Sequence, residues 1–150
     1  MQEGIYPALV ERLVEEVRKL NVGDGTQPGV TQGPLIDADA VSKLSSTLRM
    51  RYRTGNAAAG GKRHERGGTF FTPTIVGGVT REMRFAREET FGPVAPLFRF
   101  SDEAEAIAMA NDTEFGLAAY VYTRDAVRQW TVPEALDYGM DWYQYWTDFE

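Results

Sequence analysis

The sequence contains no cysteine among its 150 residues. This absence excludes disulfide bonds, zinc–thiolate sites and thiol catalysis within the chain. Histidine is scarce as well, because His64 is the only one and lies among charged residues and glycines in residues 61–68. A single histidine in such a setting indicates a surface loop rather than a metal ligand or a general base. We therefore predict no metal site in this chain.

The chain also lacks an apolar run of membrane-spanning length, and its first residues lack the charged-then-apolar layout of a signal peptide. Positive charge is in deficit, because 16 Lys and Arg stand against 22 Asp and Glu and give a formal net charge of −6. A negative balance argues against a nucleic-acid or anionic-membrane surface. We expect a cytoplasmic protein that binds neither nucleic acid nor membrane.

The composition that remains is typical of a globular domain, with 43% hydrophobic and 25% charged residues. The length is sufficient for one domain with a real core. Helical and strand periodicities alternate along the chain and are joined by short loops, which predicts an α/β layer fold. Helices are predicted over residues 4–20, 37–48, 103–109 and 124–138, and strands over 70–76, 94–100 and 116–123. Pro133 lies inside the last predicted helix and indicates a kink or a local lesion there.

The most informative stretch is the loop of residues 87–94, which reads Arg-Glu-Glu-Thr-Phe-Gly-Pro-Val. It delivers two adjacent carboxylates and an aromatic ring to the start of an apolar strand. A carboxylate accepts two hydrogen bonds and suits a pair of vicinal hydroxyls, as on a ribose. A ring beside it suits a flat heterocycle. The physical pattern alone leaves two interpretations open, a nucleotide-binding loop or a plain acidic turn before a strand.

Basic residues concentrate in residues 47–66, and a tyrosine lies among them. Such a run can mark a nucleic-acid contact, in which case binding would be sensitive to salt. It can equally be a solvated face, and this is the interpretation that we favour. The hydrophobic period fails over residues 48–54, so the sequence predicts no regular element there.

Short blocks distributed along the chain resemble the aldehyde dehydrogenase superfamily, in its order and at nearly its spacing. They occupy residues 20–25, 32–36, 60–62, 70–74, 88–94 and 110–117. The resemblance covers about residues 2–140. Residues 97–100 and 111–119 are most similar to the succinate-semialdehyde dehydrogenase branch. This resemblance implies a partial catalytic domain, a parallel sheet with flanking helices that is truncated at both ends.

The resemblance also implies a function and two site residues. Members of the superfamily oxidise an aldehyde to its carboxylic acid with NAD or NADP, through a cysteine nucleophile and a glutamate-activated water. Glu89 matches the family glutamate that holds the nicotinamide ribose, and Phe91 matches the phenylalanine beside the nicotinamide. The cysteine, the general base and the dinucleotide-binding half would precede Met1. We therefore assign no catalytic residue to this chain and expect it to be inactive alone, as a fragment of a homo-oligomeric parent.

Two segments, residues 46–57 and residues 141–150, depart from the family pattern, and we interpret both as products of a changed reading frame. One coding of residues 47–56, read in another frame, contains Ile-Ala-Asp-Ala-Leu-Ser-Asn-Gly, which restores the apolar period. Residues 1–140 then form the family domain and residues 141–150 a non-family tail, for which we predict no regular element. A genuine aromatic tail that packs or binds is the alternative. It leads to a second functional hypothesis, a non-catalytic interaction module derived from such an enzyme.

Overall fold

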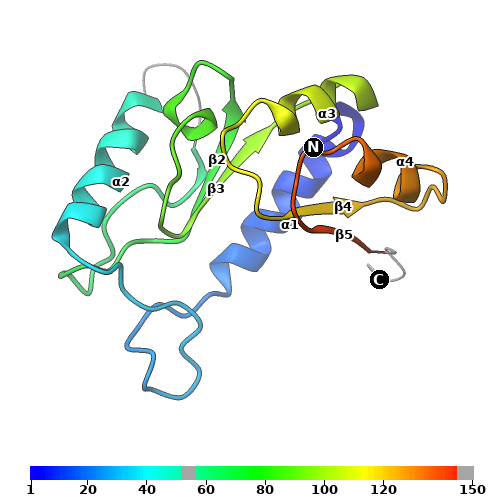
Figure 1. Ribbon diagram of the computed structural model, residues 1–150. Helices are drawn as coiled ribbons and strands as arrows, with labels where there is room; N and C mark the ends of the chain where they lie inside the picture. Colours follow the sequence, from blue (N-terminus) through cyan, green and yellow to red (C-terminus); the bar gives the residue numbers. More distant parts are fainter. Residues whose placement is uncertain (52–56, 145–150) are drawn as a thin grey trace. The chain divides into compact units, whose positions relative to one another are not determined.

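The computed structural model describes residues 1–51 and 57–144 of the chain (Figure 1). The chain divides into two compact units, residues 1–99 and residues 100–150. Each unit is an arrangement of helices and strands, and each is described by itself. The predicted α/β class with flanking helices is confirmed.

The first unit contains a three-stranded sheet in the order β1–β2–β3. Strand β2 pairs in parallel with β3 and antiparallel with β1, so the sheet is mixed. The elements of this unit are η1 (Glu3–Ile5), α1 (Tyr6–Arg18), α2 (Ala38–Arg51), β1 (Ala57–Ala59), β2 (Thr74–Val79), η2 (Arg84–Ala86) and β3 (Val94–Phe98).

Helix α1 carries an apolar stripe onto one face of this sheet, as its periodicity predicted. Pro7 occupies the first turn, where its missing N–H costs no helical hydrogen bond. Tyr6 is buried with Ile75 and Leu97 in one cluster, against which the stripe of the helix packs. The Tyr6 hydroxyl accepts a hydrogen bond from Gly78 N at 2.9 Å and donates one to Leu97 O at 3.5 Å.

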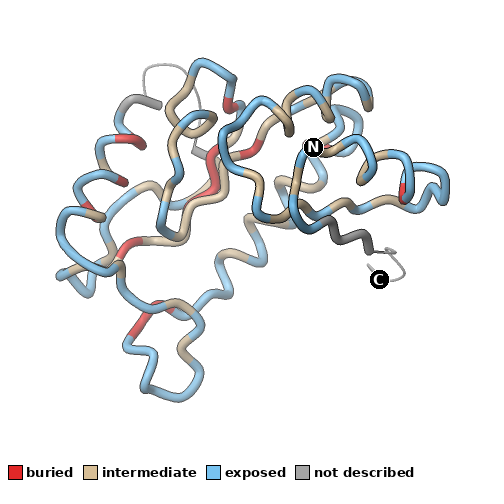
Figure 2. Tube along the Cα trace, viewed as in Figure 1, coloured by how far each residue is buried: buried red, intermediate tan, exposed pale blue. Residues whose placement is uncertain are grey.

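Helix α2 covers the opposite face of the sheet. Val41, Leu44 and Leu48, spaced three and four residues apart, point into a second buried cluster with Val76. Successive residues of a strand face opposite sides, so Ile75 packs with α1 while Val76 packs with α2. The most deeply buried positions accordingly recur along β2 and α2 (Figure 2).

A close backbone contact joins β1 to the start of β2. Gly60 follows β1 with a φ of 71°, and a Cβ atom at this position would lie only 2.2 Å from Pro73 O. The neighbouring Gly61 N donates to the Thr74 hydroxyl at 2.9 Å. Glycine is required here because it alone has no Cβ to clash and tolerates a positive φ.

The second unit contains α3 (Glu103–Asn111), β4 (Ala119–Tyr122), α4 (Arg128–Glu134) and β5 (Asp141–Gln144). Asp102 caps α3, because its carboxylate accepts from Glu105 N at 2.9 Å. Strands β4 and β5 pair in parallel, from Ala119 opposite Asp141 to Tyr122 opposite Gln144. An ion pair of 2.8 Å between Arg128 and Glu103 joins α4 to α3.

Several predicted boundaries need correction. The prediction of no element after residue 140 is wrong for residues 141–144, because the main chain there pairs with β4 and main-chain pairing requires no particular side chain. The predicted helix over 124–138 is reduced to Arg128–Glu134. The helix predicted over 37–48 continues to Arg51. Residues 52–56 and 145–150, on which the frame hypotheses partly rest, lie outside the described residues.

In the stretches that the structure describes, each helix is too short or too polar to cross a lipid bilayer.

Candidate functional site

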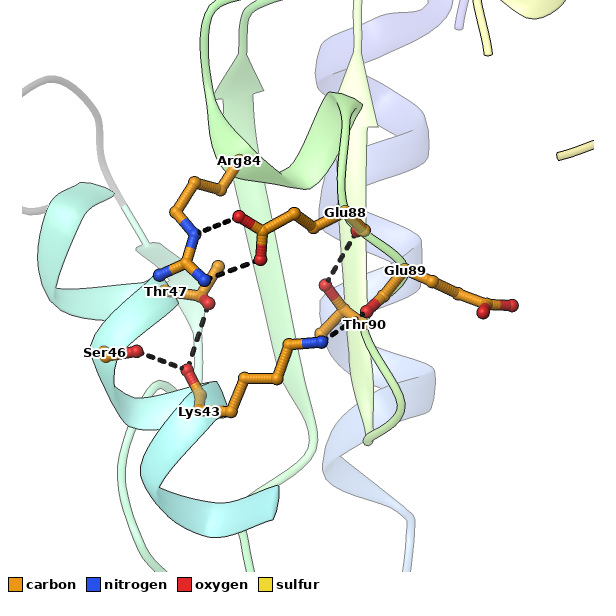
Figure 3. Close-up of polar contacts among 7 residues, drawn as sticks. All are labelled: Lys43, Ser46, Thr47, Arg84, Glu88, Glu89 and Thr90. Carbon is orange, nitrogen blue, oxygen red and sulfur yellow. Dashed lines mark hydrogen bonds and ion pairs between the residues drawn. The ribbon is translucent and has the colours of Figure 1, made fainter. Parts of the chain in front are cut away.

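The loop of residues 87–93 leads from η2 to β3 and lies against α2 (Figure 3). Its C-terminal end is fixed at Pro93, whose carbonyl accepts from Thr74 N at 2.8 Å. Gly92 sits on the apolar surface of α2, where an added Cβ would meet Leu44 Cδ2 at 3.1 Å and Leu35 Cδ2 at 3.3 Å. The loop is therefore anchored on the buried face of α2 and on the first residue of β2, the central strand of the sheet.

The two adjacent carboxylates of this loop have different surroundings. Glu88 forms a bidentate pair with Arg84, whose Nε lies 2.7 Å from Oε1 and whose Nη2 lies 2.6 Å from Oε2. Two parallel charge-assisted hydrogen bonds fix the plane and direction of a carboxylate. Glu88 is therefore engaged within the protein and is a poor candidate for holding a ligand.

Glu89 and Phe91 project from the loop instead. The Glu89 side chain points away from the Arg84–Glu88 pair (Figure 3). Among the described residues its carboxylate has no hydrogen-bond or ion-pair partner, and the side chain is exposed. Phe91 is 75% exposed, although a ring of this size normally loses most of its surface on folding. An unengaged carboxylate and an exposed ring two residues apart can accept hydrogen bonds from vicinal hydroxyls and stack on a heterocycle.

Lys43 of α2 also reaches the loop. Its Nζ donates to the Glu89 carbonyl at 3.3 Å across 46 residues of sequence. Its own carbonyl accepts from the hydroxyls of Ser46 at 2.7 Å and Thr47 at 3.0 Å (Figure 3). Sequence reasoning missed both Lys43 and Arg84. The four-residue spacing of Arg84 and Glu88 was a local signal for their ion pair. No local pattern predicts the contact of Lys43 with the loop.

His64, the only histidine, takes no part in this loop. It is half-buried, and its Nδ1 accepts from Arg66 N at 3.3 Å. Within the basic stretch of residues 47–66, the side chains of Arg49, Arg63 and Arg66 are exposed. Thr47 and Leu48, which are not basic, are buried. No group of three or more His, Asp or Glu residues in the described stretches is placed to hold a metal ion.

The surroundings of Glu88 give a pH-dependent prediction. The hydrogen bonds from Arg84 hold the pKa of the Glu88 carboxyl below its ordinary value of 4.5, partial burial opposes this, and the charges of Arg84 and Lys43 add to the lowering. The pair therefore stabilises the folded loop above pH 4.5, and this stabilisation is lost as pH falls through the lowered pKa. We expect the Glu88 carboxyl carbon to titrate below 4.5 by NMR, and to return toward 4.5 in Arg84→Gln. Titration of Glu88 at an unchanged pKa in Arg84→Gln would contradict the assignment.

Comparisons with known proteins identify the family of the chain. The model of the aldehyde dehydrogenase family matches residues 1–150, and the chain belongs to this family. It is 53% identical over 141 residues to the NADP(+) succinate-semialdehyde dehydrogenase GabD of Escherichia coli K12, covering 93% of this chain and 29% of the relative. It is 52% identical over 141 residues to a glutarate-semialdehyde dehydrogenase of Pseudomonas aeruginosa, with the same coverage.

Solved structures give the same family. The succinate-semialdehyde dehydrogenase of Burkholderia pseudomallei is similar with a TM-score of 0.92 and 50% identity, over 95% of this chain and 30% of that protein. The betaine aldehyde dehydrogenase of Staphylococcus aureus in complex with NAD+ is similar with a TM-score of 0.90 and 31% identity, over 99% of this chain and 30% of that one. The chain therefore spans less than a third of the length of these relatives.

Proposed function

We propose that this chain is one part of an enzyme that oxidises a semialdehyde, succinate semialdehyde in the first instance, to its carboxylic acid with NAD or NADP. The family membership supports aldehyde oxidation. The succinate- and glutarate-semialdehyde dehydrogenases at about half identity support a substrate with a terminal carboxylate. The parent enzyme is proposed to be a cytoplasmic homo-oligomer whose small-molecule substrate is this aldehyde.

The observation that carries the proposal is the contrast between Glu88 and Glu89. One carboxylate is held by Arg84, and the other is exposed beside the Phe91 ring. In the proposed enzyme the Glu89 carboxylate accepts hydrogen bonds from the ribose hydroxyls next to the nicotinamide, and Phe91 lies against the nicotinamide. The cofactor, when bound, accepts a hydride from the substrate. Glu89 and Phe91 orient the ring that receives the hydride and take no part in bond making.

The chain alone is proposed to be inactive. It contains no cysteine to attack an aldehyde, so the nucleophile must come from a part of the enzyme outside these residues. The isolated chain should also show no measurable NADP binding in calorimetry, because Glu89 and Phe91 would contact only one end of a dinucleotide. Micromolar binding by the isolated chain would contradict this view.

A chimeric enzyme tests the role of Glu89. Residues 2–140 replace the equivalent segment of the E. coli relative, which is 53% identical to this chain over 141 residues. We expect succinate-semialdehyde-dependent NADPH formation, and we expect Glu89→Gln to raise the KM for NADP+ by about tenfold, which corresponds to one lost charge-assisted hydrogen bond. The KM for the aldehyde should not change.

Glu65→Gln is the matched control for this variant, because it removes another exposed carboxylate from the same unit. It should leave both KM values unchanged. Equal cofactor KM values for Glu89→Gln and the parent chimera would overturn the proposed role.

The hypothesis of an interaction module, first suggested by the aromatic tail, gains support from exposed apolar side chains in the second unit. Leu117 is 79% exposed and Trp130 is 65% exposed. Such surface can bind a partner, or it can be surface that the rest of a larger enzyme covers. Sedimentation that shows a defined oligomer of the isolated chain would favour the module, whereas formless aggregation would favour the fragment.

The domain division at residue 140 is likewise proposed. If the frame hypothesis holds, the DNA that encodes residues 46–57 and 141–150 contains the alternative frames, Ile-Ala-Asp-Ala-Leu-Ser-Asn-Gly and Val-Gly-Ile-Asn-Thr-Gly-Leu-Ile. Codons that do not permit these readings would overturn it.

A further inference from the structure

We infer that Arg84 and Lys43 are positioning residues for the cofactor loop, and that together they turn Glu89 and Phe91 outward. This inference rests on the proposed function and deepens it. Neither residue is proposed to touch the cofactor. Their effect is transmitted through the main chain of residues 88–92, which they attach to η2 at one end and to α2 in the middle.

The first attachment is the Arg84–Glu88 pair. Its two hydrogen bonds, of 2.7 and 2.6 Å, hold the Glu88 side chain over η2. The main chain is fixed in the same direction, because Glu88 N donates to the Arg84 carbonyl at 2.8 Å. Both the side chain and the amide of Glu88 are bound to Arg84, so the orientation of Glu88 is fixed. The direction in which the main chain continues to Glu89 is therefore fixed as well.

The second attachment lies one residue further on. The Lys43 ammonium holds the Glu89 carbonyl on the α2 side of the loop, at 3.3 Å. Lys43 is itself well placed, because Val41 and Leu44 of the same helix are 0% and 1% exposed in the core. With the Glu89 carbonyl directed toward α2, the Glu89 side chain extends away from it, as Figure 3 shows.

The third attachment closes the loop after the two site residues. Gly92 lies on Leu44, and the Pro93 carbonyl is bound by Thr74 N. Glu89 and Phe91 thus lie between fixed points on both sides.

Amide exchange in the 150-residue chain tests the attachment directly. We expect Arg84→Gln to accelerate exchange of the Glu88 amide, which donates to the Arg84 carbonyl, by about tenfold, and to leave the amides of β2 unchanged, because only local opening becomes easier. Lys43→Met, which keeps the alkyl stem, should accelerate exchange of the same amide. Arg81→Gln removes an equal charge from an exposed residue of the connection between β2 and β3, and it should not change the exchange rates.

The chimeric enzyme then separates positioning from folding. Arg84→Gln should raise the KM for NADP+ by about fivefold without changing the KM for the aldehyde, since a misplaced contact weakens binding of the group it serves. Arg84→Lys should restore part of the loss, because an ammonium keeps the charge but forms one hydrogen bond in place of a planar pair. A general loss of stability would not give this selectivity or this rescue.

The outcomes distinguish the inference from the proposed function. If Glu89→Gln raises the cofactor KM while Arg84→Gln changes neither that KM nor the exchange of the Glu88 amide, the positioning role is overturned and the proposed function stands. If Arg84→Gln accelerates exchange but Glu89→Gln leaves the KM unchanged, the loop is held as described and the proposed function fails. If the isolated chain is unfolded, the KM values and the rescue by lysine decide.

Discussion

Replacing Leu44 with alanine should lower the free energy of unfolding of the first unit by about 2–5 kcal/mol. Leu44 is 1% exposed and packs in the cluster between α2 and β2, so its truncation leaves a cavity as well as lost apolar contact. Domains of this size are stable by only about 5–15 kcal/mol, so the loss is a large part of the total. The same side chain supports Gly92, and the loop of residues 87–93 should loosen with the core.

Urea unfolding followed by the NMR amide signals of β2 measures this effect, because those signals report on the first unit alone. The midpoint should fall while the slope against urea concentration stays the same. Ile36→Ala is the control, since Ile36 is 92% exposed and its truncation should change the free energy by no more than about 0.5 kcal/mol. Similar losses for both variants would mean that α2 does not pack on the sheet as described.

Gly60→Ala should lower the free energy of unfolding of the first unit by at least about 3 kcal/mol. The new Cβ would lie 2.2 Å from Pro73 O and 2.9 Å from Thr74 Cα, which are main-chain atoms that cannot rotate away. Relief requires that β1 move off β2. The positive φ of 71° adds a second cost for any residue with a side chain.

Gly67→Ala separates these two costs. Gly67 has nearly the same φ, 70°, but nothing lies within 4 Å of the position of its Cβ. We expect it to lose only roughly 1–2 kcal/mol, the cost of the backbone conformation. Thermal unfolding of both variants measures the difference, and equal melting temperatures would show that β1 does not approach Pro73 closely.

The elements that periodicity predicts well are those with a wide buried face. Helix α1 was predictable because its apolar residues recur at helical spacing and lie on the sheet. The strand expected at 70–76 begins instead at Thr74, because Pro73 has no N–H to donate to a ladder and Phe71 pairs only through an isolated bridge with Arg63. Boundaries of this kind depend on individual hydrogen bonds, which hydrophobic patterns do not contain.

The site shows a similar division. Glu89 and Phe91 could be selected from one short motif, and whether they hold the cofactor stays a prediction. The sequence could not show whether Glu88 or Glu89 is unengaged, because this depends on the direction in which the Arg84 side chain points. The contact of Lys43 with the Glu89 carbonyl joins residues 46 positions apart, and no local pattern encodes such a contact. Strand β5 was missed because its pairing uses the main chain.

The position of α1 has a consequence for folding during synthesis. The Tyr6 hydroxyl donates to Leu97 O, 91 residues later. At translation rates of about 5–20 residues per second, the surface that α1 covers is incomplete for roughly 5–20 seconds after α1 is made. During that interval the apolar stripe of the helix is available to chaperones. Ribosome-bound chains shorter than this span should therefore depend on chaperones far more than chains that include β3.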